Sequence, residues 1–95
     1  MEYYKGLEKG AAKRKPDPIN AEFGRRLKEV FEKHGVSQKG VCRITGLSNT
    51  LMHFWANGYK TIRISAFAQI ADKVSLTTSE IVYLLEPYWE DEDDE

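Results

Sequence analysis

Apolar and polar residues recur along this chain with the period of an α-helix. The first apolar set, at relative positions i, i+4, i+7 and i+8, comprises Phe23, Leu27, Val30 and Phe31. We expect its helix to begin at an Asn20 N-cap and to end at Gly35, because these residue types stabilise the two ends of helices. Arg25 and Arg26 fall on the opposite side of this helix, where we expect them to face solvent.

Two very short helices are expected in the middle of the chain. Ser37 caps the first, and Gly46 ends it. Ser48 caps the second, which runs to about Asn57 and ends at Gly58. The apolar positions of these two helices are Val41, Cys42, Ile44, Leu51, Met52 and Trp55.

Two more helices follow. The first spans residues 64–74 and lacks a good N-cap, because Arg63 fills that position. Thr77 and Glu80 form a capping box that opens the second, and this helix must finish before Pro87. No segment shows the alternation of a strand. Five short helices predict an all-α fold, a compact orthogonal bundle.

The net charge of −1 hides a strong asymmetry along the chain. Residues 1–63 hold 13 of the 14 Lys and Arg but only 6 of the 15 Asp and Glu, a balance of +7. Residues 64–95 hold one base and nine acids, a balance of −8. Such a division indicates a charged partner, so the near-zero total gives no reason to exclude DNA.

The composition divides the chain into an arm, one domain and a tail. Residues 1–18 are rich in Lys, Gly and Pro, and we expect a flexible basic arm that either is merely solvated or lies along a nucleic-acid backbone. Residues 19–86 are expected to form the helical domain. Residues 87–95 end in six consecutive acids and predict a disordered acidic tail, which either solubilises the protein or competes with DNA for the basic half.

Composition and spacing argue against several classes of protein. The single cysteine, Cys42, cannot form an intramolecular disulfide and indicates a reducing compartment. No apolar run has the length of a signal peptide or a membrane span, so we expect a cytoplasmic protein without membrane association. His34, His53 and Cys42 lack the spacing of metal ligands, and no nucleophile is paired with a base. We therefore expect no metal, no cofactor and no enzymatic activity.

The segment from Gln38 to Asn57 says most about function. A turn of three or four residues around Gly46 forces the axes of the two flanking helices steeply across each other. Gly46 leaves the first helix in a left-handed conformation without steric cost, and the small Cys42 lets the helices approach closely. The residues that fit this geometry are Gln38, Val41, Cys42, Gly46, Leu47, Ser48, Met52, Trp55 and Gly58.

These residues resemble the helix-turn-helix of the Cro and phage-repressor-like regulators, the XRE type, over about Ala21 to Leu85. The resemblance implies a five-helix lambda-repressor-like domain. It also implies sequence-specific binding of double-stranded DNA and regulation of transcription, in the manner of a phage or mobile-element repressor or activator.

The resemblance further implies which residues contact DNA. The second helix of the motif, about residues 48–57, enters the major groove, and the loop at Tyr59 and Lys60 binds phosphate. Hydroxyl, amide and imidazole side chains on this helix suit base edges, and nearby Lys and Arg side chains suit phosphates. The predicted DNA-binding residues are Gln38, Lys39, Ser48, Asn49, Thr50, His53, Asn57, Tyr59 and Lys60. His53 is either such a contact or an ordinary surface residue.

Two positions depart from the family pattern. Phe54 stands where Arg or Lys is common, and Ala56 where Glu is common. With Leu51 also partly outward, this face is more apolar than expected, and it either touches thymine methyl groups or forms a protein-binding patch. The alternative function is therefore a protein-interaction module on the same fold, such as an antirepressor, an antitoxin-like protein or a polymerase-recruiting partner, which binds through this face or the acidic tail.

We expect a homodimer, because one helix reads only a short half-site and a twofold operator doubles the contact. The last helix and the residues after it carry more apolar surface than one small helix needs. The expected dimer surface is Tyr83, Leu84, Leu85, Tyr88 and Trp89.

Overall fold

The computed structural model describes residues 15–93, with side chains for residues 15–89. Within this range the chain is helical and contains no strand. The helices are α2 (Pro18–Lys33), α3 (Gln38–Thr45), α4 (Asn49–Ala56), α5 (Ile64–Val74) and α6 (Thr78–Asp93). The predicted all-α bundle is confirmed.

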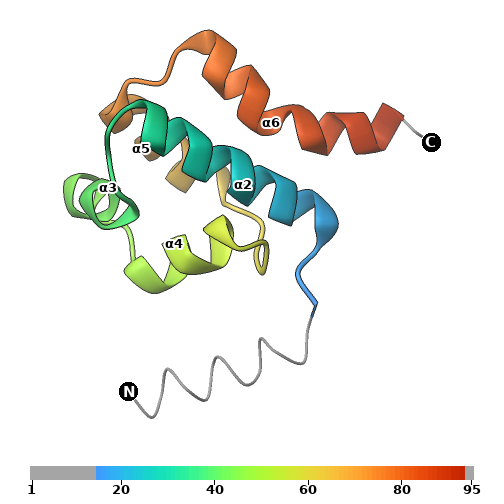
Figure 1. Ribbon diagram of the computed structural model, residues 1–95, viewed down its shortest axis with the longest axis horizontal. Helices are drawn as coiled ribbons and strands as arrows, with labels where there is room; N and C mark the ends of the chain where they lie inside the picture. The colour runs from blue at the N-terminus through green and yellow to red at the C-terminus, as the bar shows by residue number, and fades with distance from the viewer. Residues whose placement is uncertain (1–14, 94–95) are drawn as a thin grey trace.

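The long helix α2 lies at the centre of the bundle. α6 crosses α2 on one side, and α4 packs against it on the other (Figure 1). α3 packs against both α4 and α5. α4 and α6 therefore lie on opposite sides of the first helix of the described chain.

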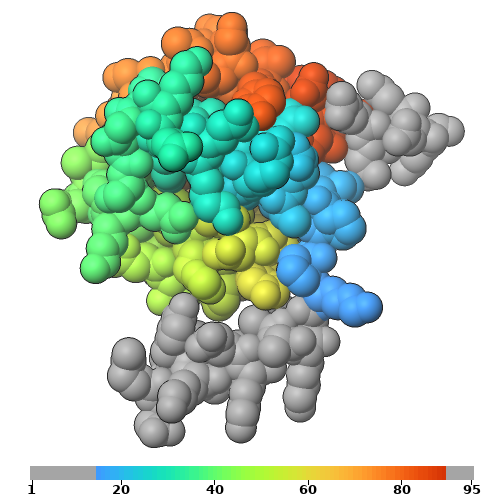
Figure 2. All heavy atoms as spheres, in the orientation of Figure 1, coloured from blue at the N-terminus to red at the C-terminus, as the bar shows by residue number. Residues whose placement is uncertain are grey.

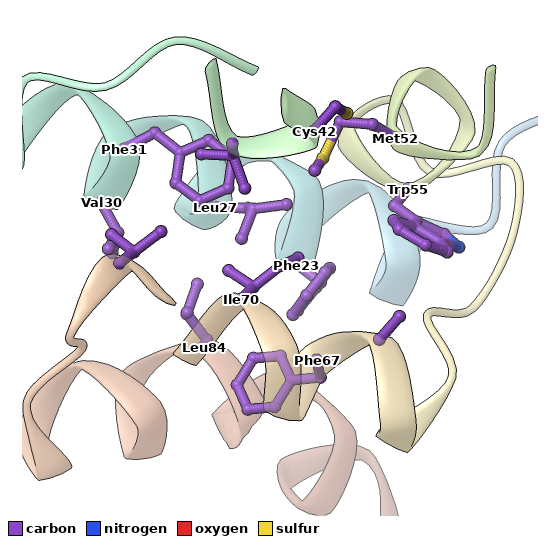
Figure 3. Packing of buried hydrophobic residues seen from close by; sticks show 13 residues of the cluster. Phe23, Leu27, Val30, Phe31, Cys42, Met52, Trp55, Phe67, Ile70 and Leu84 are labelled. Atoms are coloured by element: carbon purple, nitrogen blue, oxygen red, sulfur yellow. The ribbon is translucent and has the colours of Figure 1, made fainter. Parts of the chain in front are cut away.

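The core fills the space between these helices (Figure 3). The largest fully buried side chains come from all five helices and are Trp55, Phe23, Leu27, Met52, Ile70, Leu84 and Val41. The period predicted for the first helix is confirmed, because its apolar set is buried. One expectation is wrong, because Leu84 is 0% exposed and belongs to the core rather than to a dimer surface. Among the apolar positions of α3, Val41 and Cys42 are buried and Ile44 is 50% exposed.

α2 begins earlier than predicted. Its N-cap is Asp17, whose Oδ2 accepts a hydrogen bond of 2.9 Å from the Asn20 N–H, and Pro18 is the first helical residue. Proline suits this position because the first turn needs no N–H there and its φ is already helical. Asn20 is buried, its Nδ2 donates to Thr61 Oγ1 at 3.0 Å, and its Oδ1 accepts from the Tyr88 hydroxyl at 2.6 Å. The expected Asn20 cap is therefore wrong.

The starts of the last two helices agree with the prediction. Arg63 is the N-cap residue of α5 and forms no side-chain cap hydrogen bond, as predicted. The capping box is confirmed, since the Glu80 N–H donates to Thr77 Oγ1 at 3.1 Å and the Thr77 N–H donates to Glu80 Oε1 at 2.9 Å. His34 Nε2 also lies 2.8 Å from Glu80 Oε1. The buried carboxylate of Glu80 thus joins the start of α6 to the end of α2.

α6 continues through Pro87 to Asp93, so the prediction that it finishes before Pro87 is wrong. Proline lacks the N–H that would bind the carbonyl oxygen of Tyr83, four residues earlier. Arg26 supplies the missing donor, because its Nη1 lies 2.8 Å from that oxygen. Residues 87–93, which the sequence assigned to the acidic tail, are accordingly helical in the structure. Residues 1–14 of the expected arm and residues 94–95 of the expected tail lie outside the described residues.

Candidate nucleic-acid interface

The turn between α3 and α4 consists of Gly46, Leu47 and Ser48. Gly46 has a φ of 78°, the left-handed conformation predicted for it, and its N–H donates to the Cys42 carbonyl oxygen at 2.8 Å. Leu47 packs against the core, and its N–H donates to Thr45 Oγ1 at 3.2 Å. Local hydrogen bonds and one apolar side chain therefore fix the angle between the two helices.

Cys42 lies beside this turn and is 5% exposed, with Sγ 3.8 Å from the Ser48 carbonyl oxygen. Burial raises the pKa of its thiol, so the side chain stays protonated near neutral pH and acts in packing. Among residues 15–93, no group of three His, Cys, Asp or Glu side chains is placed to hold a metal ion. No helix in this range is both long enough and apolar enough to cross a membrane.

α4 rests directly on the backbone of α2. Its buried residues are Met52, Trp55 and Ala56, and Figure 3 shows the first two in the core. At Gly24 of α2, a Cβ atom would lie only 2.3 Å from the Ala56 carbonyl oxygen. α2 thus has no room for a larger side chain where it touches α4. This close contact determines which side of α4 faces α2 and which side faces outward.

The predicted DNA-binding residues gather on two adjoining pieces of surface, the outward side of α4 and the first turn of α3. Residues in a helix follow one another at 3.6 per turn, so the buried side of α4 leaves the opposite side to four residues. These four, all half-buried, are Thr50, His53, Phe54 and Asn57. Asn49 at the start of α4 is exposed, as is Lys39 on α3, while Gln38 is half-buried. Leu51 is half-buried and packs against the core, so it contributes less to the outward face than expected.

Two of the predicted base-reading residues also complete the ends of α4. Ser48 Oγ accepts from the Leu51 N–H at 3.2 Å, which confirms the predicted N-cap. Asn57 Nδ2 donates to the His53 carbonyl oxygen at 2.8 Å and lies 3.3 Å from His53 Nδ1. Asn49, in contrast, forms no side-chain hydrogen bond to any residue the structure describes.

A group of aromatic and cationic side chains lies at the end of α4, and sequence reasoning did not assemble it. The centroid of the Phe54 ring is 5.9 Å from that of His53 and 6.3 Å from that of Tyr59, which it meets nearly edge-on at 81°. Lys60 Nζ lies 5.6 Å from the same centroid, within cation–π distance. The Tyr59 N–H donates to the Phe54 carbonyl oxygen at 2.9 Å. We call these four residues the Phe54 cluster; its only sequence signal was the unusual residue at position 54.

The interface carries positive charge without matching carboxylates. Between Glu32 and Asp72 the sequence contains no Asp or Glu. Four exposed cations in this stretch form no ion pair with a described residue, and they are Lys39, Arg43, Lys60 and Arg63. They lie on α3 and on the loop after α4, so they flank the outward side of α4.

The arginines of α2 are different, because carboxylates neutralise them. Arg25 Nη2 lies 2.8 Å from Glu22 Oε2, Arg26 Nε lies 2.7 Å from the same oxygen, and Arg26 Nη1 lies 2.8 Å from Glu86 Oε1. Hydrogen bonds from both guanidinium groups lower the pKa of Glu22 to about 2. The Arg26 side chain is only 14% exposed, so its predicted solvent-facing position is wrong.

The described carboxylates of α6 lie away from the outward side of α4. α6 packs on the side of α2 opposite α4 (Figure 2). Of its acidic side chains that the structure describes, Glu80 is buried and Glu86 forms an ion pair with Arg26.

Much of the expected dimer surface is used inside the domain. The Tyr83 hydroxyl donates to Glu29 Oε1 at 2.6 Å, and the Tyr88 hydroxyl is bound to Asn20. An apolar hollow of about 410 Å³ remains beside α6, and its lining residues are Thr61, Ile62, Ile64, Phe67, Leu85, Tyr88 and Trp89. Ile64 is 82% exposed at this hollow, and Trp89 is 41% exposed.

Comparison with models of protein families, with curated proteins and with solved structures found no match to this chain.

Proposed function

We propose that this chain binds double-stranded DNA sequence-specifically and regulates transcription, with α4 lying in the major groove. One observation carries the proposal. Four exposed cations without ion pairs in the described chain lie on α3 and on the loop after α4, the elements directly before and after α4, in a stretch of sequence without carboxylates. A polyanion is the partner that such a surface suits best, because neutralised phosphates dominate the affinity of proteins for DNA.

The shape of the surface favours duplex DNA over other polyanions. The major groove is wide enough for one α-helix, and among residues 15–93 no other helix lies across the outward side of α4. In our assignment, Asn49 and Thr50 read base edges, and Lys39 and Lys60 contact the phosphates on either side. The free N–H groups at the start of α3 and α4 add partial positive charge toward the same phosphates. The resemblance to phage-repressor-like regulators supports the same arrangement.

A salt series on full-length protein tests this proposal. Binding to a fluorescent duplex, first of random sequence and then of sequences selected from a random library, is measured by anisotropy at increasing salt. Four neutralised phosphates predict a log–log slope of about −3 to −4. Lys60→Ala is expected to lower the magnitude of the slope by about 1. Lys73 is an exposed cation on α5, and Lys73→Ala serves as the control that leaves the slope unchanged. Binding that is absent or independent of salt would overturn the proposal.

The alternative function, a protein-interaction module, is favoured by one observation. The hollow beside α6 exposes Ile64 and Trp89, and monomeric domains usually bury such side chains. Ile64→Asp separates the two functions. If the protein is an interaction module, Ile64→Asp should abolish binding of the protein partner. If the protein binds DNA, Ile64→Asp should leave the affinity of one protein chain for a single half-site unchanged.

The dimer belongs to the same proposal. Because Leu84 is buried, we assign the contact between two copies to the hollow at Ile64, Leu85 and Trp89. We place the protein in the cytoplasm, where a free thiol such as that of Cys42 stays reduced.

A further inference from the structure

Phe54 lies near the middle of the outward side of α4. Thr50 lies one turn before it, and His53 and Asn57 lie beside it on the same side. A surface that reads only hydrogen-bonding groups gains nothing from a phenyl ring at its centre, and burying polar base edges against such a ring costs free energy. The position therefore calls for an apolar ligand group.

The neighbours of Phe54 leave the ring little freedom to move. The His53 and Tyr59 rings contact it, and the Lys60 ammonium approaches it at 5.6 Å. A ring already held in this way loses little conformational entropy on binding. The Lys60 ammonium lies beside the Phe54 ring. This part of the surface therefore offers a cation for a phosphate next to an apolar face for a base.

The side chain of Asn57, one turn after His53, is bound to the end of α4. The Asn57 amide donates to the His53 carbonyl oxygen and so closes the end of α4. Between Thr50 at one end and Asn57 at the other, the Phe54 ring beside the His53 imidazole is the apolar group on this side of α4.

We propose that Phe54 is a specificity-determining residue that packs against the C5-methyl group of thymine in the major groove. Thymine is the one of the four DNA bases that presents a methyl group there, beside its O4 acceptor, whereas adenine, guanine and cytosine present polar atoms and no methyl group. The inference rests on the proposed DNA binding and deepens it by naming the base that this position selects.

The experiment removes single methyl groups from DNA. Duplexes are first selected from a random library with full-length protein, and each thymine of the best duplex is then replaced by deoxyuridine, which lacks only the methyl group. We expect a loss of about fourfold in affinity at one thymine of each half-site, the size expected for one buried methyl group. With Phe54→Gln, the same replacement should have no effect, because the apolar contact is already gone.

Two further variants distinguish the loss of the thymine contact from a folding defect and from the loss of a positive charge. Phe54→Leu keeps an apolar side chain and should still discriminate thymine from uracil. Lys60→Ala should weaken binding to both duplexes alike. If wild-type protein selects duplexes but no uracil replacement weakens binding, or if Phe54→Gln shows the wild-type loss, the inference is overturned while DNA binding stands. If no duplex is selected at all, the proposed function falls with it.

Discussion

Arg26 Nη1 donates a hydrogen bond of 2.8 Å to the carbonyl oxygen of Tyr83, which lacks a helical partner because Pro87 has no N–H. The same guanidinium group lies 4.5 Å from the centroid of the Tyr83 ring. It also forms ion pairs with Glu22 and Glu86. One side chain of α2 thus permits α6 to continue past a proline.

Replacing Arg26 with Ala should destabilise the domain by about 2 kcal/mol, because the Tyr83 carbonyl oxygen would lose its remaining donor. Urea unfolding followed by circular dichroism measures the loss. Arg25→Ala is the matched control, since Arg25 bonds the same Glu22 but is 59% exposed. We expect that control to unfold like the wild type.

Pro87→Ala tests the reason for the Arg26 effect. Alanine restores an N–H for the Tyr83 carbonyl oxygen, so Arg26→Ala should cost at least about 1 kcal/mol less in this background than in the wild type. Strictly additive costs in the double-mutant cycle would show that Arg26 acts through its ion pairs alone.

The acid stability of the domain should depend on Glu80. Hydrogen bonds from the Thr77 N–H and from His34 lower the pKa of Glu80 to about 2. An unfolded glutamate has a pKa of about 4.3, so this carboxylate stabilises the fold above that pH, and the contribution is lost as pH falls toward 2. In Glu80→Gln the free energy of unfolding should fall less steeply across this window, by urea unfolding at successive pH values. Curves parallel to the wild type would contradict the prediction.

Gly24→Ala should weaken the packing of α4 on α2. The added methyl group would lie 2.3 Å from the Ala56 carbonyl oxygen, which belongs to backbone and cannot turn aside. We expect a loss of about 2–3 kcal/mol in urea unfolding, despite the better helix propensity of alanine. Gly40→Ala on α3 is the control, because its Cβ would meet only the Ser37 hydroxyl at 3.2 Å. Equal stability of the two variants would show that α4 can shift freely.

Asn49 and Lys60 should differ in what they contribute to DNA affinity. Asn49→Ala is expected to cost about 1–3 kcal/mol on a selected duplex and little on a random one, because the proposal assigns Asn49 to reading bases. Lys60→Ala should weaken binding to both, because the proposal assigns Lys60 to phosphate. Anisotropy titrations on the two duplexes measure both effects. Equal losses from Asn49→Ala on the two duplexes would remove Asn49 from the base-reading residues.

The assembly of two copies should depend on the hollow beside α6. Ile64→Asp places a charge at a side chain that is 82% exposed, so the domain should fold while its sedimentation mass falls from dimer to monomer. Val82→Asp, on an exposed part of α6, should remain a dimer. A wild type that is monomeric at every concentration would contradict the dimer. Leu84→Asp cannot serve as this test, because a charge in the core unfolds the domain.

Features that depend on residues close together in the sequence were predictable. The Ser37 and Ser48 caps, the left-handed Gly46 and the Thr77–Glu80 box each involve partners within four positions, so the residue types at those positions suffice to determine them. The helical period likewise identified the buried side of the first helix.

Features that depend on distant partners were not predictable. Asn20 looked like a cap because its partners Thr61 and Tyr88 lie 41 and 68 positions away. Pro87 looked like the end of a helix because its compensating donor is Arg26. In both cases a buried polar group needed a partner, and only the tertiary structure shows which residue supplies it.

The sequence by itself determined the helical class, the turn between the two short helices and the separation of charge along the chain, since these follow from local residue types. The tertiary structure alone decided which cations remain without carboxylates and that Phe54, Tyr59 and Lys60 meet at the end of α4. The physical reason is that ion pairing and ring packing depend on distance in space, which is set by how α4 and α6 pack on opposite sides of α2.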